Sequence, residues 1–278
     1  MATPLIDFEQ LIGRYSVLLL DAYGVLVGAQ GALPHAARWI DTLNRQHQSY
    51  YILSNDASRL PVTTAERYQA YGLAIAAERI ITSGTLLRAH FARHNLRGKT
   101  CAVLGPGESM AYVEEAGGIN VSWREDFEVL VIGDETGYPL LEAGDAVLTR
   151  LFDKLDRGQG VELVLPNPDL IFPKGAGHFG FASGSIAAMF ETALRGRYGD
   201  RPELRFQRLG KPDTAMFQRA RQLAGSDDLV MVGDQRETDI RGANAFGIDS
   251  VLVESGPSPV ADDDLEPALR PTFRLHLD

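Results

Sequence analysis

The sequence predicts an α/β fold in which a parallel sheet draws its strands from both ends of the chain, with a second α/β module inserted between them. The first observation is that strands alternate with helices in both terminal parts. The second is the apolar run 17–20, which ends abruptly at Asp21. A buried parallel strand has this pattern where it reaches the edge of its sheet. The length of 278 residues suffices for one or two domains with a substantial core.

The N-terminal part supplies the first helices and strands of the main sheet. Pro34 suits the first turn of a helix expected at 34–46, and Gly72 suits the end of a helix expected at 63–71. Further strands are expected at 50–53 and 79–82. Each crossover between parallel strands is expected to be right-handed.

The inserted module is expected to span 85–203, so that the main domain comprises 1–84 and 204–278. Its apolar patterns predict helices at 86–94, 109–115, 140–155 and 185–194, and strands at 101–104, 128–132 and 161–165. The stretch 166–184 is rich in proline and glycine, and 195–205 is polar, so both are expected to be loops or linkers.

The main pattern resumes after the module. Strands are expected at 206–209, 229–232 and 250–253, with helices at 214–223 and up to Phe246. The acidic run 262–264 is expected to be a solvated loop. The first and last parts of the chain are therefore expected to contribute to one core sheet.

Composition and charge exclude several classes of protein. The formal net charge is -10 and no basic run is present, so nucleic-acid binding is not expected. Cys101 is the single cysteine, which excludes an internal disulfide framework and a cysteine-rich zinc site. No secretory signal and no apolar run near the ~20 residues of a membrane span is visible. We therefore expect a cytoplasmic protein without a membrane partner.

Carboxylates close two of the expected strands of the main sheet. Asp21 ends the first strand, and Asp234 follows the strand at 229–232. Ligands of open parallel sheets lie outside the carboxyl ends of the strands, where these side chains are expected. Oxygen ligands from two carboxylates suit Mg²⁺. The sequence therefore predicts a magnesium site at this edge.

Groups that bind an oxyanion follow other strands of the same sheet. Ser54 and Asn55 follow the strand at 50–53, and Lys211 follows the strand at 206–209. A hydroxyl, an amide and an ammonium group can together hold a tetrahedral anion, and Pro212 places Lys211 at the entrance of a helix.

In this order, the motifs Asp-x-x-Gly-Val, Ser-Asn, Gly-Lys-Pro and Gly-Asp-x-x-x-Thr-Asp resemble those of the haloacid dehalogenase (HAD) superfamily. The segments 166–169 and 184–187 are similar to those of its class IIA branch, the NagD-like and 4-nitrophenylphosphatase-like hydrolases. The resemblance implies a Rossmann-like HAD core with an inserted α/β cap of the C2 type. In that branch the cap often mediates dimerisation, so a homodimer through the cap is a further expectation.

The resemblance assigns the metal and the nucleophile. Asp21 would attack the substrate and form an aspartyl-phosphate. The backbone carbonyl of Tyr23 and the carboxylate of Asp234 would complete the protein ligands of Mg²⁺. Asp239 would support the metal by orienting a water bound to it.

The resemblance also assigns the binding of a small phosphorylated substrate. Ser54, Asn55 and Lys211 would hold the transferring phosphoryl group, and electrostatic stabilisation of that group supplies most of the catalysis. Asn167 and Asp169 of the module would shape the substrate entrance, although a turn-stabilising role explains them equally well.

Tyr23 departs from the pattern of the phosphatases, which carry a second aspartate at this position. A phenol has a pKa of about 10, so it can donate a proton but is a poor base near neutrality. Losing a positioned acid/base costs roughly 10²–10⁴-fold in rate. We therefore expect a Mg²⁺-dependent phosphatase that is slow or specialised. A non-catalytic phosphate-binding protein is the second hypothesis, and a 2-haloacid dehalogenase, which Asp-Ala-Tyr-Gly also resembles, is the third.

A second Gly-Asp pair lies inside the module, where the apolar run 129–132 precedes Gly133 and Asp134. Five residues after Asp134 lies Pro139, whereas five residues after Asp234 lies Asp239. Asp134 therefore lacks the paired carboxylate, and we interpret it as a turn residue.

Overall fold

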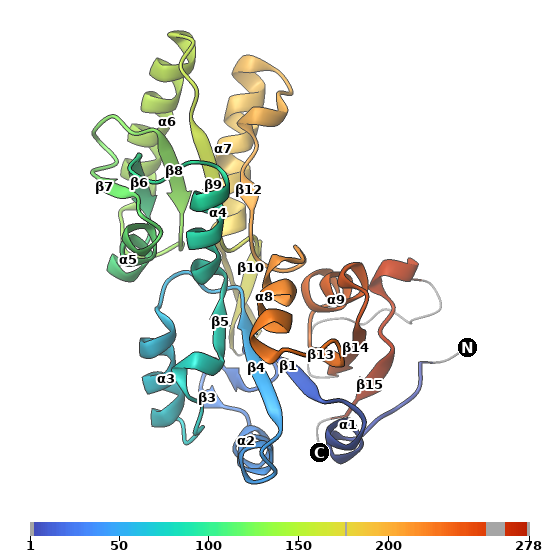
Figure 1. Ribbon diagram of the computed structural model, residues 1–278. Helices are drawn as coiled ribbons and strands as arrows, with labels where there is room; N and C mark the ends of the chain where they lie inside the picture. Colours follow the sequence, from blue (N-terminus) through green and yellow to red (C-terminus); the bar gives the residue numbers. More distant parts are fainter. Residues whose placement is uncertain (1–2, 176, 254–264, 277–278) are drawn as a thin grey trace. The chain divides into compact units, whose positions relative to one another are not determined.

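The computed structural model describes residues 3–175, 177–253 and 265–276 (Figure 1). These residues pack into two compact units. Unit 2 comprises Asn55–Leu60 and Ser83–Gly210, and unit 1 comprises the rest of the chain. Residues 55–60, 83–84 and 204–210, which the sequence pattern groups with the main domain, pack with the inserted module.

Unit 1 contains a six-stranded sheet with the order β15-β14-β13-β1-β4-β5, in which every neighbouring pair is parallel. Its strands are β1 (Val17–Asp21), β4 (Ser49–Ser54), β5 (Ile80–Thr82), β13 (Leu229–Gly233), β14 (Asp249–Val253) and β15 (Phe273–Leu275). β1 lies between a strand from the N-terminal part and a strand from the C-terminal part (Figure 1). This confirms the α/β class and a parallel sheet assembled from both ends of the chain.

The helices of unit 1 bury the sheet. They are α1 (Phe8–Arg14), α2 (Ala36–Arg45), α3 (Pro61–Ala70), α8 (Ala215–Ala224) and α9 (Arg241–Phe246). Alternate residues of a strand point to the same face, so Leu18 and Leu20 of β1 enter one cluster with Leu11 of α1 and with Ile40 and Leu43 of α2. All five are fully buried, which fixes the position of β1 from one face.

Unit 2 contains a five-stranded parallel sheet with the order β12-β9-β8-β6-β7. Its strands are β6 (Thr100–Leu104), β7 (Ile119–Val121), β8 (Val129–Ile132), β9 (Glu162–Leu165) and β12 (Gln207–Arg208). Its helices are α4 (Leu87–Arg93), α5 (Gly107–Glu115), α6 (Leu140–Asp156) and α7 (Ser183–Tyr198). Its core is formed by Leu104, Phe127 and Leu130 together with Val147 of α6 and Leu194 of α7.

The expected strand at 206–209 is shorter than predicted and lies in a different sheet. It is β12, and Gln207 pairs with Val164 of β9 in unit 2, so it does not extend the sheet of unit 1. A local apolar pattern predicts a strand but contains no information on its partner. The helix expected to end at Leu194 runs on through Gly196 to Tyr198 and ends at Gly199, whose φ is +79°.

The stretch 166–184, expected to be a loop, contains an antiparallel hairpin of β10 (Ile171–Gly175) and β11 (His178–Phe181). Short elements were also missed: α1, β7, β15 and the hairpin of β2 (Val27–Gly28) with β3 (Gly31–Ala32). The run 262–264 lies outside the described residues. No helix in the described part of the chain combines the length and apolar character that crossing a bilayer requires.

Candidate active site

The nucleophile expected from the sequence lies at the carboxyl end of β1. Leu20 is in register with Val232 of β13 on one side and with Ile52 of β4 on the other. Because the three strands are parallel and end together, the residues that follow β13 flank Asp21. The side chain of Asp21 is almost fully buried.

Lys211 connects two of the expected site carboxylates. Its Nζ lies 2.5 Å from Oδ1 of Asp21 and 2.6 Å from Oδ1 of Asp239, and it donates to the backbone oxygen of Leu53 at 3.0 Å. An ammonium group has three protons, and these three acceptors match them. Lys211 is only 2% exposed, so the pair of carboxylates holds its charge away from solvent.

A single π-helical turn, Arg236–Ile240, joins the two carboxylates that follow β13. The amide of Ile240 donates to the oxygen of Gln235, five residues back, and the amide of Gln235 donates to Oδ2 of Asp239 at 3.1 Å. A π turn is wider than an α turn and is frequent at functional sites. The five-residue spacing between Asp234 and Asp239 therefore brings both carboxylates back to the same strand end.

Two glycines allow the carboxylates to approach the backbone. A Cβ at Gly24 would collide with the carboxylate of Asp234, and one at Gly233 would collide with that of Asp239. Gly24 also has a φ of +91°, in a turn closed by its amide bonding to the oxygen of Val27 at 2.8 Å. The close approach of a carboxylate to the backbone thus explains why both motif positions are glycine.

The three aspartates have the geometry that a cation requires. Carboxylate oxygens of Asp21, Asp234 and Asp239 all lie within 4.8 Å of one another. Oδ1 of Asp234 is buried and has no hydrogen-bond partner among the described residues. An orphaned buried acceptor beside a second carboxylate fits a hard cation with oxygen ligands, as Mg²⁺ is. The residues present therefore fit a metal in this place.

The electrostatics of the cluster also favour a second cation. Burial raises the pKa of Asp21 to about 7, although the charge of Lys211 opposes this and that of Asp239 adds to it. Burial raises the pKa of Asp234 to about 8, and the negative charges of Asp21 and Asp239 add to this effect. The pKa of Lys211 is raised, because its two carboxylate partners outweigh the opposing effect of burial. One ammonium group thus faces three carboxylates, and full ionisation needs another positive charge.

Tyr23 lies two residues beyond Asp21, half-buried against the core of unit 1. Burial raises the pKa of its phenol, Asp234 raises it further, and Arg67 acts in the opposite direction. The phenol therefore stays protonated at neutral pH, as a possible proton donor and not as a base.

The expected substrate-binding residues fall into two groups. Ser54 is the last residue of β4 and lies in register with Thr82 of β5, in unit 1. Asn55 belongs to unit 2, where its Nδ2 donates to Oδ1 of Asp169 at 2.9 Å. Oδ1 of Asn167 accepts the amide of Asp169 at 3.0 Å, which is the geometry of an Asx turn. In the structure the amide oxygen of Asn167 therefore stabilises a turn.

The structure thus brings together Asp21, Lys211, Asp234 and Asp239. It adds the carbonyl of Leu53, which contacts Lys211 but has no signature in the sequence because it is a backbone group. It also adds the amide of Gln235, which orients Asp239. The glycines at 24 and 233 were the available signal that backbone and carboxylate approach closely here.

Comparison with known proteins finds related hydrolases. The family described as haloacid dehalogenase-like hydrolase matches residues 18–119, and a HAD-hydrolase-like family matches residues 208–276. A dihydroxyacetone phosphatase of Corynebacterium glutamicum is 30% identical over 260 residues, which are 93% of this chain and 87% of that protein.

Solved structures share the fold over nearly the whole chain. A possible sugar phosphatase of the HAD superfamily from Cytophaga hutchinsonii has a TM-score of 0.83 at 30% identity, with 99% of this chain and 98% of that one covered. A glycerol phosphate phosphatase of Mycobacterium tuberculosis in complex with magnesium has a TM-score of 0.76 at 24% identity, with 98% and 77% covered. The chain therefore belongs to the haloacid dehalogenase superfamily of hydrolases, in its class IIA, NagD-like phosphatase group.

Proposed function

We propose that this protein is a Mg²⁺-dependent phosphatase that hydrolyses a small phosphorylated metabolite through an aspartyl-phosphate on Asp21. The observation that carries the proposal is the buried cluster in which Lys211 joins Asp21 to Asp239 beside the orphaned carboxylate of Asp234. A carboxylate, an ammonium group and a cation site at one strand end are the parts that phosphoryl transfer needs.

The residues of the chain have separate tasks in this reaction. Lys211 holds Oδ1 of Asp21 and thereby orients the carboxylate. A carboxylate oxygen of Asp21 forms a bond to phosphorus while the ester P–O bond breaks, and water then hydrolyses the acyl phosphate and restores Asp21. Asp21, Asp234 and the backbone carbonyl of Tyr23 would hold Mg²⁺, with Asp239 supporting them. When bound, the metal would neutralise charge on the phosphoryl oxygens.

Ser54, Asn55 and Lys211 would bind the phosphoryl group, and Asp169 would support Asn55 through their hydrogen bond. Asn167 would act on the substrate side only indirectly, through the turn that it forms with Asp169. Unit 2 would act as the cap that excludes water and selects the substrate.

The substrate is proposed to be the phosphate ester of a small polyol or sugar. The support comes from relatives named as phosphatases of dihydroxyacetone, acid sugar and glycerol phosphates. Such esters have poor leaving groups, whose departing oxygen must gain a proton. The protonated phenol of Tyr23 would donate this proton. In the second step, a phenol is a poor base and would activate the attacking water only slowly, so we propose slow turnover.

Replacing Tyr23 tests this proposal directly. With Mg²⁺ and 4-nitrophenyl phosphate, whose leaving group needs no proton, we expect measurable phosphate release by the wild type. Tyr23→Asp should raise the rate by about 10- to 100-fold because it restores an acid/base, within the range for positioned acids and bases. Tyr23→Phe should spare this substrate and slow glycerol phosphate hydrolysis. If neither the wild type nor Tyr23→Asp releases phosphate from any ester in a broad panel, the phosphatase proposal is wrong.

A non-catalytic phosphate-binding protein is the second candidate, favoured by Tyr23 at the position of the acid/base. Calorimetry separates the two, because saturable binding of glycerol phosphate without turnover would support the binding protein. A 2-haloacid dehalogenase is less well supported, because Asp234 and Asp239 would repel a carboxylate substrate at this strand end. Chloride release from 2-chloropropionate without metal would instead make the dehalogenase the best-supported function.

We also propose a homodimer formed through unit 2. Apolar side chains are exposed on the hairpin of β10 and β11 and on α7: Leu170, Ile171, Phe179, Phe181 and Met189. Phe181 is 76% exposed. Contiguous apolar patches of this kind commonly mark protein interfaces. Analytical ultracentrifugation should show a dimer for the wild type and a monomer for Phe181→Ser; a monomeric wild type would contradict the proposal.

A further inference from the structure

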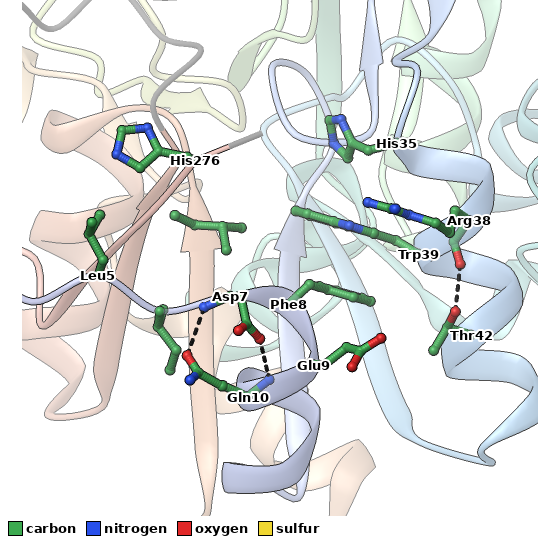
Figure 2. A pocket seen from close by; sticks show the side chains of 12 residues that line it. Leu5, Asp7, Phe8, Glu9, Gln10, His35, Arg38, Trp39, Thr42 and His276 are labelled. Carbon is green, nitrogen blue, oxygen red and sulfur yellow. Dashed lines mark hydrogen bonds between the residues drawn. The ribbon is translucent and has the colours of Figure 1, made fainter. Parts of the chain in front are cut away.

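A cavity lies in unit 1, and no residue of the carboxylate cluster lines it (Figure 2). Its volume is about 470 Å³, and it is formed by the segment Leu5–Gln10, by α2 and by the end of β15. This volume is in the range of sites for small molecules, which lies at roughly 300–1,000 Å³. None of the residues to which the proposed phosphatase reaction assigns a role lines this cavity.

The cavity has an aromatic floor. The rings of Phe8 and Trp39 stack with centroids 4.2 Å apart and an angle of 2° between their planes. His35 packs on the other side, with its ring centroid 4.4 Å from that of Trp39. Ile6 and Leu275 add buried aliphatic surface. A flat ring entering the cavity would therefore find apolar and aromatic partners.

The floor is rigid before any ligand arrives. Nε2 of His35 lies 2.7 Å from the backbone oxygen of Val25, and since a carbonyl only accepts, Nε2 carries the proton. Burial lowers the pKa of His35, and the nearby charge of Arg38 lowers it further. His35 is thus a neutral, fixed wall of the cavity. A preformed site avoids the cost of ordering its side chains on binding.

The rim of the cavity carries charged side chains of both signs. Figure 2 shows Arg38 on one side of the cavity and His276 on the other. Among the described residues the guanidinium of Arg38 has no ion pair, and the indole N–H of Trp39 has no acceptor. Asp7 is already engaged, because its carboxylate caps α1 by accepting the amide of Gln10. Among the described residues that line the cavity, Glu9 is the other carboxylate, and it limits the negative charge that the site tolerates.

We propose that this cavity is a binding site for a small aromatic monocarboxylate, with its ring against the half-buried ring of Phe8, which stacks on Trp39, and its carboxylate on the exposed Arg38. A guanidinium pairs with a planar carboxylate through two parallel hydrogen bonds, and its strength there exceeds that of neutral contacts. Glu9 disfavours a dianionic phosphate and so distinguishes this ligand from the substrate of the phosphatase site. The inference does not depend on the proposed function.

Tryptophan fluorescence tests the proposal without any activity measurement. The chain has two tryptophans, so Trp123→Phe leaves Trp39 as the single emitter. In that background, phenylacetate should change the emission saturably, and the cation phenethylamine of similar size should not. Isothermal titration of the unmodified protein with phenylacetate should give the same dissociation constant.

Variants of α2 supply the control. Arg38→Gln should weaken phenylacetate binding about tenfold or more, as loss of a charge-assisted pair does. Arg45→Gln, on the same helix but outside the cavity, should leave it unchanged. Glu9→Gln should strengthen binding. Both positions 38 and 9 are exposed, so the fold should persist. Absence of saturable binding, preference for phenethylamine, or an Arg38→Gln variant that binds like wild type would each overturn the proposal.

Discussion

Two buried strands of this chain end in Gly-Asp, and their carboxylates have different surroundings. After β13, Asp234 lies within 4.8 Å of two further carboxylates, and Lys211 pairs with both of these. After β8 in unit 2, Oδ1 of Asp134 accepts the amide of Thr136 at 2.9 Å and its hydroxyl at 2.5 Å. The first aspartate leaves an acceptor atom free for a cation, whereas the second stabilises its own turn.

The difference arises from the neighbouring strands and from the residues that follow. β13 lies beside β1, which ends in Asp21, whereas β8 lies between β6 and β9, which end in leucines. A π turn returns Asp239 to the strand end after Asp234, whereas the residue five positions after Asp134 is Pro139. The same dipeptide thus becomes a site in one sheet and a turn in the other.

The largest effect expected from this comparison is on catalysis. Asp21→Asn should lower phosphate release on the order of 10⁴-fold or more, because removal of a nucleophile has effects of this size. Asp134→Asn, the matched change at the other strand end, should alter the rate by less than about threefold, since Asp134 has no role in the proposed reaction. Steady-state assays of both variants check this. Equal losses of rate would show that the strand ends at Asp21 and Asp134 do not differ in function.

The two buried lysines allow a comparison of stability. Lys211 has partners that are 9% and 1% exposed, whereas Lys154 of unit 2 pairs at 2.9 Å with Asp126, which is 70% exposed. Lys211→Met should lower the free energy of unfolding by about 3 kcal/mol, because it leaves two buried carboxylates uncompensated. Lys154→Met should cost less than about 1 kcal/mol, because its partner stays solvated. Urea titration without metal measures both, and a smaller loss for Lys211→Met would argue against the buried network.

Metal binding should also distinguish Asp234 from Asp134. Mg²⁺ at tenfold excess over its dissociation constant should stabilise the wild type by about 1.4 kcal/mol, by mass action alone. Asp234→Asn should abolish this gain because it removes a charged ligand, and Asp134→Asn should retain it. Thermal unfolding with Mg²⁺ or with EDTA gives the comparison. A gain that survives Asp234→Asn would place the metal elsewhere.

The smallest expected effect concerns His90, which is buried in unit 2. Its Nε2 has no partner in the described part of the chain, and burial, with His94 and Arg93, lowers its pKa to about 4. Between about pH 6.5 and pH 4, His90 is therefore protonated in the unfolded state but neutral in the folded state. The free energy of unfolding falls as the pH falls through this range. From pH 7 to 5.5 the loss should be about 1 kcal/mol. Denaturation of His90→Phe should lack this component; an unchanged pH dependence would exclude His90 as its source.

Much of the site could be predicted from the sequence. Asp21 and Asp234 each end an apolar run, so their positions at one sheet edge follow from the order of the elements. The position of Lys211 does not follow in this way, because the strand before it, β12, pairs in the sheet of unit 2. The hairpin of β10 and β11 could not be predicted, because its apolar residues are exposed among prolines and glycines. The partner of β12 could not be predicted either, since pairing between distant strands depends on packing.

The sequence by itself determined the chemistry that is available: a carboxylate at the end of the first strand, a tyrosine two residues after it, and a second Gly-Asp with a paired aspartate. The tertiary structure decided which of these groups meet. The sheet places β1 between β4 and β13, so that Lys211 reaches Asp21, Asp239 and the carbonyl of Leu53 together. Local propensity acts over a few residues, whereas contacts across 190 residues of chain depend on the burial of the whole sheet.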